Sequence, residues 1–166
     1  VPLTDLLFLT SGGEYRAQAG EGLVITPTTL SVSPQSYYGS TAVRPIVAGD
    51  VALFVSAGEF VRDLSFQINN NKFIGRDITV LARHLFDLRR IIDWDYAPAP
   101  SALAFSVMND GDGLFLTYQP DQDVYAWTRA TTKGAYKSTC SVREGEFDVI
   151  YVIVERTIDG NTVSFI

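Results

Sequence analysis

The sequence has a single cysteine, Cys140, and a single histidine, His84, in 166 residues. One cysteine excludes an internal disulfide framework and a metal site built on cysteines, so we interpret Cys140 as a small apolar strand residue. A Ser-His-Asp or Cys-His catalytic set would have to include His84. The spacing places no serine or cysteine near it, so we expect His84 to pack or cap locally. No catalytic residue, cofactor or metal site is predicted.

Basic residues are few, and long apolar runs are missing. The chain has 13 lysines and arginines against 19 aspartates and glutamates, which gives a formal net charge of -6. The densest basic pair is Arg89-Arg90, whereas a protein that neutralises DNA phosphates needs clustered positive charge. We therefore expect no binding of DNA through its phosphates. Because no run of about 18 apolar residues occurs, we expect no membrane segment.

Apolar residues are plentiful and recur in short runs. They make up 46% of the sequence, and the 12% of aromatic residues lie mostly in strand-like segments, which favours β-structure over disorder. Hairpin-like segments begin at residues 6, 51, 103 and 149, a spacing of roughly the 40–50 residues that one β-propeller blade needs. The sequence predicts a mainly β fold, an antiparallel meander of hairpins that is propeller-like or a partial propeller.

One segment has the periodicity of a short α-helix, at about residues 77–88. Asp77 is a good N-cap residue because its side chain can accept a backbone N–H bond. The predicted apolar face consists of Ile78, Leu81, Leu85 and Leu88. We expect this helix to pack its leucine stripe on the sheet.

Acidic residues suggest two kinds of site. Asp110 and Asp112 alternate with glycines, as in a calcium loop. The segment lacks the spacing and closing glutamate of an EF-hand, and Asp-Gly pairs are typical of tight hairpins, so we interpret residues 109–113 as a turn. Two carboxylates about 5–10 Å apart would suit glycoside hydrolysis, which makes a glycosidase fragment a further hypothesis. Its candidate carboxylates are Asp93, Asp95, Asp121, Asp123, Asp148 and Glu155.

Aromatic side chains suggest an alternative function, a carbohydrate-binding β-module of a surface or depolymerase protein. Tyr37 and Tyr38 lie in a predicted loop. With Trp94, they are the possible surface contacts that could stack on sugars. Trp127 alternates with Tyr125 in a predicted strand, so we expect its ring to pack in the core.

An ordered series of motifs is more specific than any of these residues. Its elements are Val61-Arg62-Asp63-Leu64, the helix motif of residues 77–85, the aromatic-proline connector of residues 94–100, and the motifs of residues 112–118, 124–134 and 149–160. In this order they resemble a family of tail proteins from short-tailed bacteriophages and prophages, called tail tubular protein B, the nozzle or the packaged-DNA stabilisation protein. Residues 3–16 and 26–39 resemble the preceding part of that family, so the resemblance covers nearly the whole chain. The departures are Ile78, Ala97 and Ala130, where family members often have leucine, glutamine and histidine.

The resemblance implies a non-enzymatic part of a virion tail, made in the cytoplasm of the host bacterium. It implies a ring of six copies around a channel, with a tail adaptor and distal tail proteins as partners. DNA would pass through without sequence-specific binding, and the negative charge of the chain is compatible with such a conduit.

Five residues are expected to hold the architecture together: Arg62, Asp77, His84, Trp127 and Arg156. The chain begins at Val1-Pro2 and ends inside a predicted strand. We therefore expect residues 1–166 to be a single β-rich fragment of a larger protein, with possible sub-units 1–50 and 51–166.

Overall fold

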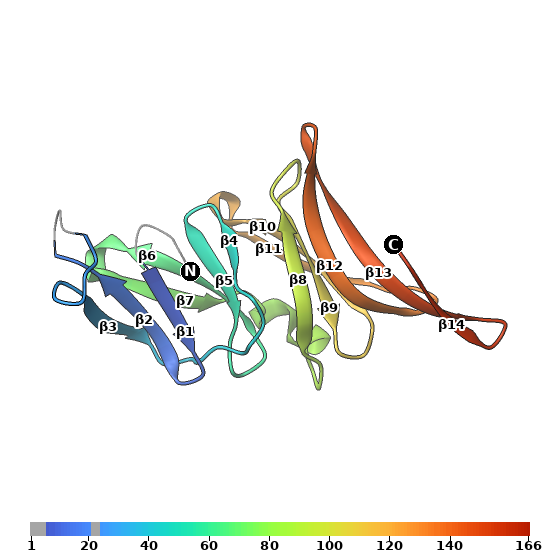
Figure 1. The fold of residues 1–166 in the computed structure, drawn as a ribbon, viewed down its shortest axis with the longest axis horizontal. Helices are drawn as coiled ribbons and strands as arrows, with labels where there is room; N and C mark the ends of the chain where they lie inside the picture. The colour runs from blue at the N-terminus through green and yellow to red at the C-terminus, as the bar shows by residue number, and fades with distance from the viewer. Residues whose placement is uncertain (1–5, 21–23) are drawn as a thin grey trace. The chain divides into compact units, whose positions relative to one another are not determined.

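The computed structural model describes residues 6–20 and 24–166, and their strands form four antiparallel sheets (Figure 1). The chain separates into two compact units, Val1–Ile78 and Thr79–Ile166. In every sheet, strands that neighbour one another are consecutive along the chain. The prediction of a mainly β fold built from antiparallel hairpin meanders is confirmed. The division after Ile78 differs from the expected sub-units 1–50 and 51–166.

The first unit starts with a three-stranded sheet in the order β1-β2-β3. Its strands are β1 Leu6–Thr10, β2 Gly13–Gln18 and β3 Ser31–Ser36. The chain reverses at Ser11-Gly12, and the register places Phe8 opposite Tyr15. β3 lies at one edge of this sheet, where Pro34 is tolerated because it has no N–H to donate to a further strand.

A four-stranded sheet completes the first unit in the order β4-β5-β6-β7. Its strands are β4 Ile46–Ala48, β5 Val51–Val55, β6 Val61–Gln67 and β7 Lys72–Asp77, and the short 3-10 helix η1, Ile68–Asn70, joins the last two. Every residue of β5 is buried. Leu7 of β1 packs in one hydrophobic cluster with Phe54, Leu64 and Phe73. The two sheets of this unit therefore share a core.

The second unit contains a four-stranded sheet in the order β11-β10-β9-β8. Its strands are β8 Ile91–Ala97, β9 Leu103–Met108, β10 Gly113–Gln119 and β11 Val124–Ala130, with the 3-10 helix η3, Pro120–Gln122, between the last two. Leu114 and Leu116 of β10 are fully buried together with Phe105 of β9. Like β4–β7, this sheet is a four-stranded meander in chain order, the strand order of a propeller blade.

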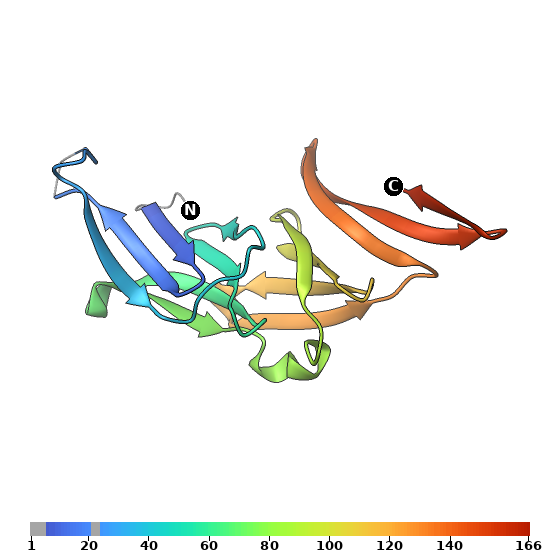
Figure 2. The same cartoon turned by 60° about the horizontal axis from the view of Figure 1, so that its bottom comes forward.

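A long hairpin and a short third strand form the last sheet, in the order β12-β13-β14. The strands are β12 Ala135–Glu144, β13 Phe147–Ile158 and β14 Asn161–Phe165. Figure 2 shows that β12 and β13 curve along their length. A register shift between Tyr136 and Ser138 interrupts their pairing. Such an irregularity increases the local bend of a strand.

The expected α-helix at residues 77–88 is wrong in type and extent. The segment forms a 3-10 helix, η2, Val80–Leu85, which is interrupted by non-helical torsions at Ala82. Asp77 ends β7, where it pairs with Arg62, and the N-cap position of η2 is Thr79. The remaining segment is short for an α-helix. The leucine stripe does not face a sheet: Leu81 and Leu88 are exposed.

Candidate functional site

Arg62 of β6 holds an aromatic loop in the first unit. Its guanidinium carbon lies 3.6 Å from the centre of the Tyr38 ring, and its Nη1 atom donates to the carbonyl of Gly75 at 3.1 Å. A Cβ atom on Gly75 would lie 3.4 Å from the Tyr38 ring, so the ring lies directly against this part of β7. Arg62 thus contacts both the loop that carries Tyr38 and the backbone of β7.

The two tyrosines of this loop differ in their surroundings. Tyr37 is 74% exposed and is free to meet a partner, whereas Tyr38 is stacked under Arg62. The loop is also tied down by Glu14, a buried residue of β2 whose carboxylate accepts bonds from the Ser36 hydroxyl and the Tyr38 N–H. Sequence analysis missed Glu14. β2 also contains Arg16 and Gln18, so no local pattern marks Glu14 as buried.

Trp94 is not a surface contact, and that expectation is corrected here. The residue is fully buried in β8. Successive side chains of a strand point to opposite faces, so Trp94 faces away from its neighbours Asp93 and Asp95. The carboxylates of both flanking aspartates bond to β12. Without Trp94, the proposed sugar-binding surface is reduced to Tyr37 and to Tyr38, whose ring already contacts Arg62.

Trp127 packs in the second unit, although its ring is only half-buried. It lies in β11 opposite Leu116, and the Phe86 ring meets it edge-on at a centroid distance of 4.9 Å. Its described ring contact is with Phe86, which directly follows η2.

The other predicted bracing residues are not gathered in one place. Asp77 ends β7, and the N-cap position of η2 is Thr79, with no side-chain cap bond. His84 is exposed on η2. Arg156 of β13 donates from Nη2 to the Thr132 hydroxyl at 3.0 Å, which secures the link between β11 and β12.

The β9–β10 turn is the most strongly bonded polar cluster described in the second unit. Arg89 binds Asp110 through Nε at 2.6 Å and Asp112 through Nη2 at 2.8 Å. Arg129 of β11 binds the same Asp112 through Nε at 2.9 Å. The bond from Arg89 lowers the pKa of Asp110, and the same bond raises the pKa of Arg89.

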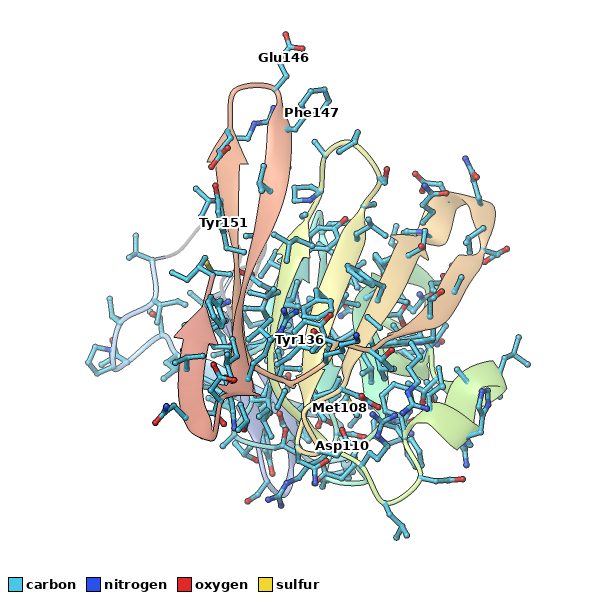
Figure 3. The ribbon with its side chains drawn as sticks, turned by 90° about the vertical axis from the view of Figure 1, so that its right-hand side faces the viewer. Met108, Asp110, Tyr136, Glu146, Phe147 and Tyr151 are labelled. Atoms are coloured by element: carbon cyan, nitrogen blue, oxygen red, sulfur yellow. The ribbon has the colours of Figure 1, made fainter. Side chains whose placement is uncertain are left out.

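The backbone of this turn explains its Asp-Gly sequence. Gly111 has a φ of +88°, and a Cβ atom there would lie 2.6 Å from that of Ala135. Its carbonyl accepts the Tyr136 N–H at 2.8 Å. The prediction of a turn is confirmed, and its two aspartates are bound by arginines. Figure 3 shows Asp110, Met108 and Tyr136 at this end of the unit.

Several carboxylates proposed for glycoside hydrolysis serve as backbone anchors instead. Asp93 Oδ2 accepts the Thr139 N–H at 2.9 Å, and Asp95 Oδ2 accepts the Ser141 N–H at 2.7 Å. These bonds attach β12 alongside β8. Asp148 accepts the N–H of Ala99 at 2.8 Å.

The remaining carboxylates of that set are placed differently. Glu155 pairs with Lys137 at 3.0 Å. Asp121 and Asp123 lie exposed at η3.

One face of the β12–β13 hairpin is apolar and exposed. The register pairs Cys140 with Tyr151 and Ser138 with Ile153, so these side chains share a face. We call the exposed residues Cys140, Val142, Phe147, Tyr151 and Ile153 the apolar face. It contains a groove of about 350 Å³, which Ile166 also lines.

The rim of the apolar face is acidic at the hairpin tip. The Tyr151 hydroxyl donates to Glu144, and this bond raises the pKa of Tyr151. Figure 3 shows Glu146 at the tip with Phe147 beside it. Sequence analysis treated this hairpin only as a strand pair, because alternation alone does not say whether a neighbour covers the second face.

Comparisons with known proteins give no family assignment: no protein-family model matches the chain, and a search of curated proteins found no significant match. Within residues 6–20 and 24–166, no group of three or more histidine, cysteine, aspartate or glutamate side chains is arranged to hold a metal ion. In the same residues, no helix is long and apolar enough to span a membrane.

Proposed function

We propose that this chain is a structural component of a bacteriophage or prophage virion tail, part of a nozzle or tail tube. Its role is to join the portal side of the particle to the distal tail and to help retain or conduct DNA. The supporting observation is that the motifs of residues 61–64, 94–100, 112–118 and 124–134 each include part of a strand of two four-stranded meanders, β4–β7 and β8–β11, while residues 77–85 include η2 and residues 149–160 lie largely on β13.

The motif residues make contacts that suit a scaffold. Arg62, in the first motif, braces Tyr38. Asp112 opens the fourth motif and receives two arginines, and Arg156, in the last motif, holds Thr132. Each contact secures a turn or a link between strands, as is expected of a structural protein in a tail tube.

The charge of the chain agrees with a conduit. The net charge is -6, and like charges repel phosphates, so DNA would slide past such a surface without being held. The proposed partners are further copies of the chain, a tail adaptor and distal tail proteins, in a particle assembled in the bacterial cytoplasm.

The decisive experiment locates the protein in particles. An antibody against this chain is applied to purified phage or induced prophage particles from the source bacterium and viewed by immunogold electron microscopy. We expect gold at the tail end of the particle, and we expect portal and terminase genes beside the coding gene. Label confined to the host cell surface or the soluble fraction, with particles unlabelled, would refute the proposal.

A further inference from the structure

Three Asp-Gly steps occur at hairpin turns of the second unit: Asp110-Gly111, Asp112-Gly113 and Asp159-Gly160. Such a step can rearrange covalently, because glycine has no side chain that keeps its backbone nitrogen away from the preceding carboxyl group. The rearrangement is favoured by a carboxyl group without ionic partners, a glycine N–H without an acceptor and a backbone that can move. The structure separates the three steps by these requirements.

The first step of the β9–β10 turn is restrained at both of its reacting groups. The Asp110 carboxylate binds Arg89 Nε at 2.6 Å, and this bond lowers the pKa of Asp110, so the carboxyl group is less often protonated. The Gly111 N–H donates to the Met108 carbonyl at 3.0 Å. The carboxyl group and the nitrogen are therefore both engaged elsewhere.

The second step of the same turn is restrained by ion pairs and by packing. The Asp112 carboxylate accepts bonds from Arg89 Nη2 at 2.8 Å and from Arg129 Nε at 2.9 Å. Gly113 is buried in β10, and a Cβ atom there would lie 2.5 Å from the Phe105 ring. Its backbone thus has little room to turn toward the carboxylate.

The turn between β13 and β14 lacks these restraints. Asp159 and Gly160 have φ values of +49° and +79°, the two positive values of a type I′ turn. Both residues are exposed, and a Cβ atom on Gly160 would meet nothing within 4 Å. Among the described residues, none bonds to the Asp159 carboxylate and none accepts the Gly160 N–H.

The chain on both sides of this turn is also open. Residues 156–162 are all exposed, and β14 is the edge strand of its sheet. Figures 1 and 2 show the turn at the tip of the last hairpin. Segments with few buried contacts open locally at a small cost in free energy. The Asp159 carboxyl group can therefore reach the next nitrogen more often than the other two aspartates can.

We propose that Asp159 is the main site at which this chain forms isoaspartate. The Gly160 nitrogen attacks Cγ of the protonated Asp159 carboxyl group and a C–N bond forms. The amide hydrogen and the carboxyl hydroxyl leave as water, which gives a five-membered succinimide. Water then adds to one of the two imide carbonyls: addition at Cγ restores aspartate, and addition at the main-chain carbonyl leaves a backbone that runs through Cγ. No electrons are gained or lost, and water is the only co-reactant.

Isoaspartate would change the last hairpin. It adds one methylene group to the main chain, so the two-residue turn no longer fits the register that pairs Ile158 with Asn161. β14 should then pair less firmly with β13. This inference goes beyond the proposed function, because it depends only on the chain itself and on water.

The first test follows the full chain during incubation at physiological temperature and pH. Peptide mapping by mass spectrometry with electron-transfer fragmentation locates isoaspartate, and an isoaspartyl methyltransferase with labelled S-adenosylmethionine measures its total amount. Isoaspartate at Asp159 should accumulate faster than at Asp110 or Asp112, on the order of tenfold or more, because the β9–β10 turn must open before it can react. In guanidinium chloride, which removes the folded restraints, the three sites should react at similar rates.

Two matched variants assign the methyltransferase label to its site. Asp159→Glu keeps the charge but would need a larger, slowly formed ring, so most of the label should be lost. Asp110→Glu makes the same change in the β9–β10 turn and should leave the label nearly unchanged. Circular dichroism checks that both variants are folded. Equal accumulation at the three sites of the folded chain, no isoaspartate at position 159, or the same preference for that position in guanidinium chloride would overturn the proposal.

Discussion

At the scale of single residues, a few polar side chains hold several backbone segments at once. Arg62 combines a stack on Tyr38 with a bond to a β7 carbonyl. Arg89 reaches two aspartates of one turn and also donates to the Leu85 carbonyl. Glu14 is fully buried and receives bonds from two residues of the β3 end. Loss of any one such group removes several contacts at once, so its effect on stability is not that of a single bond.

Trp94 gives the clearest single-residue prediction. Trp94→Ala removes a fully buried ring and should lower the free energy of unfolding by about 3–5 kcal/mol. Tyr37→Ala, at an exposed ring, should change it by less than about 0.5 kcal/mol. Urea titration followed by circular dichroism measures both. Equal effects of the two substitutions would show that Trp94 is not buried.

The Asp110 carboxylate predicts a dependence of stability on pH. Its folded pKa is lowered by the bond from Arg89, so its contribution is fully present above its unfolded pKa of about 3.9 and is lost as the pH falls through the lower, folded value. The stability difference between wild type and Asp110→Asn should be constant at neutral pH and shrink below about pH 4. Denaturant titrations from neutral to acidic pH test this. A difference that is unchanged in acid would exclude the Arg89 contact as its source.

At the scale of elements, side-chain carboxylates join strands that do not share a sheet. Asp93 and Asp95 of β8 occupy alternate positions and accept N–H groups from alternate residues of β12. Carboxylates that bond backbone N–H groups are strong acceptors. The long hairpin is thus fastened along one strand, while its apolar face stays open.

The carboxylate contact to β12 predicts a local effect. Asp93→Ala leaves the Thr139 N–H without its acceptor and should destabilise the second unit by about 1.5–3 kcal/mol. Hydrogen exchange at Thr139 should speed up by on the order of tenfold or more if local opening governs it. Asp121→Ala, at an exposed carboxylate of η3, is the control. The same exchange rate in both variants would contradict the role of Asp93.

At the scale of the whole chain, two features govern behaviour in solution: consecutive four-stranded meanders and an excess of acidic residues. Meanders with strands in chain order bring mostly near neighbours together, which limits the entropy that loop closure costs. The acidic excess opposes contact with other polyanions.

The negative charge predicts weak contact with nucleic acid. Fluorescence anisotropy of a labelled DNA duplex at physiological salt should show a Kd weaker than about 10⁻⁴ M, the weak end of the range for non-specific DNA-binding proteins. Lowering the salt concentration should not strengthen DNA binding greatly, because the chain has few clustered cationic side chains that could displace counterions from the DNA. Micromolar binding with a steep salt dependence would contradict the conduit role.

The hairpins could be predicted from the sequence because the patterns that indicate them lie within short segments of the chain. The runs of β1–β2, β5–β6, β9–β10 and β13–β14 alternate or are apolar, and turn residues such as Gly111 separate them. β7 and β8 were missed: one was read as the entry to a helix, and the other carries two aspartates. Their ladder partners are the adjacent strands β6 and β9. What the local pattern does not show is that the aspartates of β8 also bond to the distant strand β12.

The sequence alone therefore determined the β class, the hairpin turns and the net charge, since these follow from nearest neighbours along the chain. Only the tertiary structure decided that Trp94 is buried, that Leu81 and Leu88 protrude, and that Arg89 binds Asp110. Burial and ion pairing depend on which distant segment covers a side chain, and periodicity carries no information about that segment.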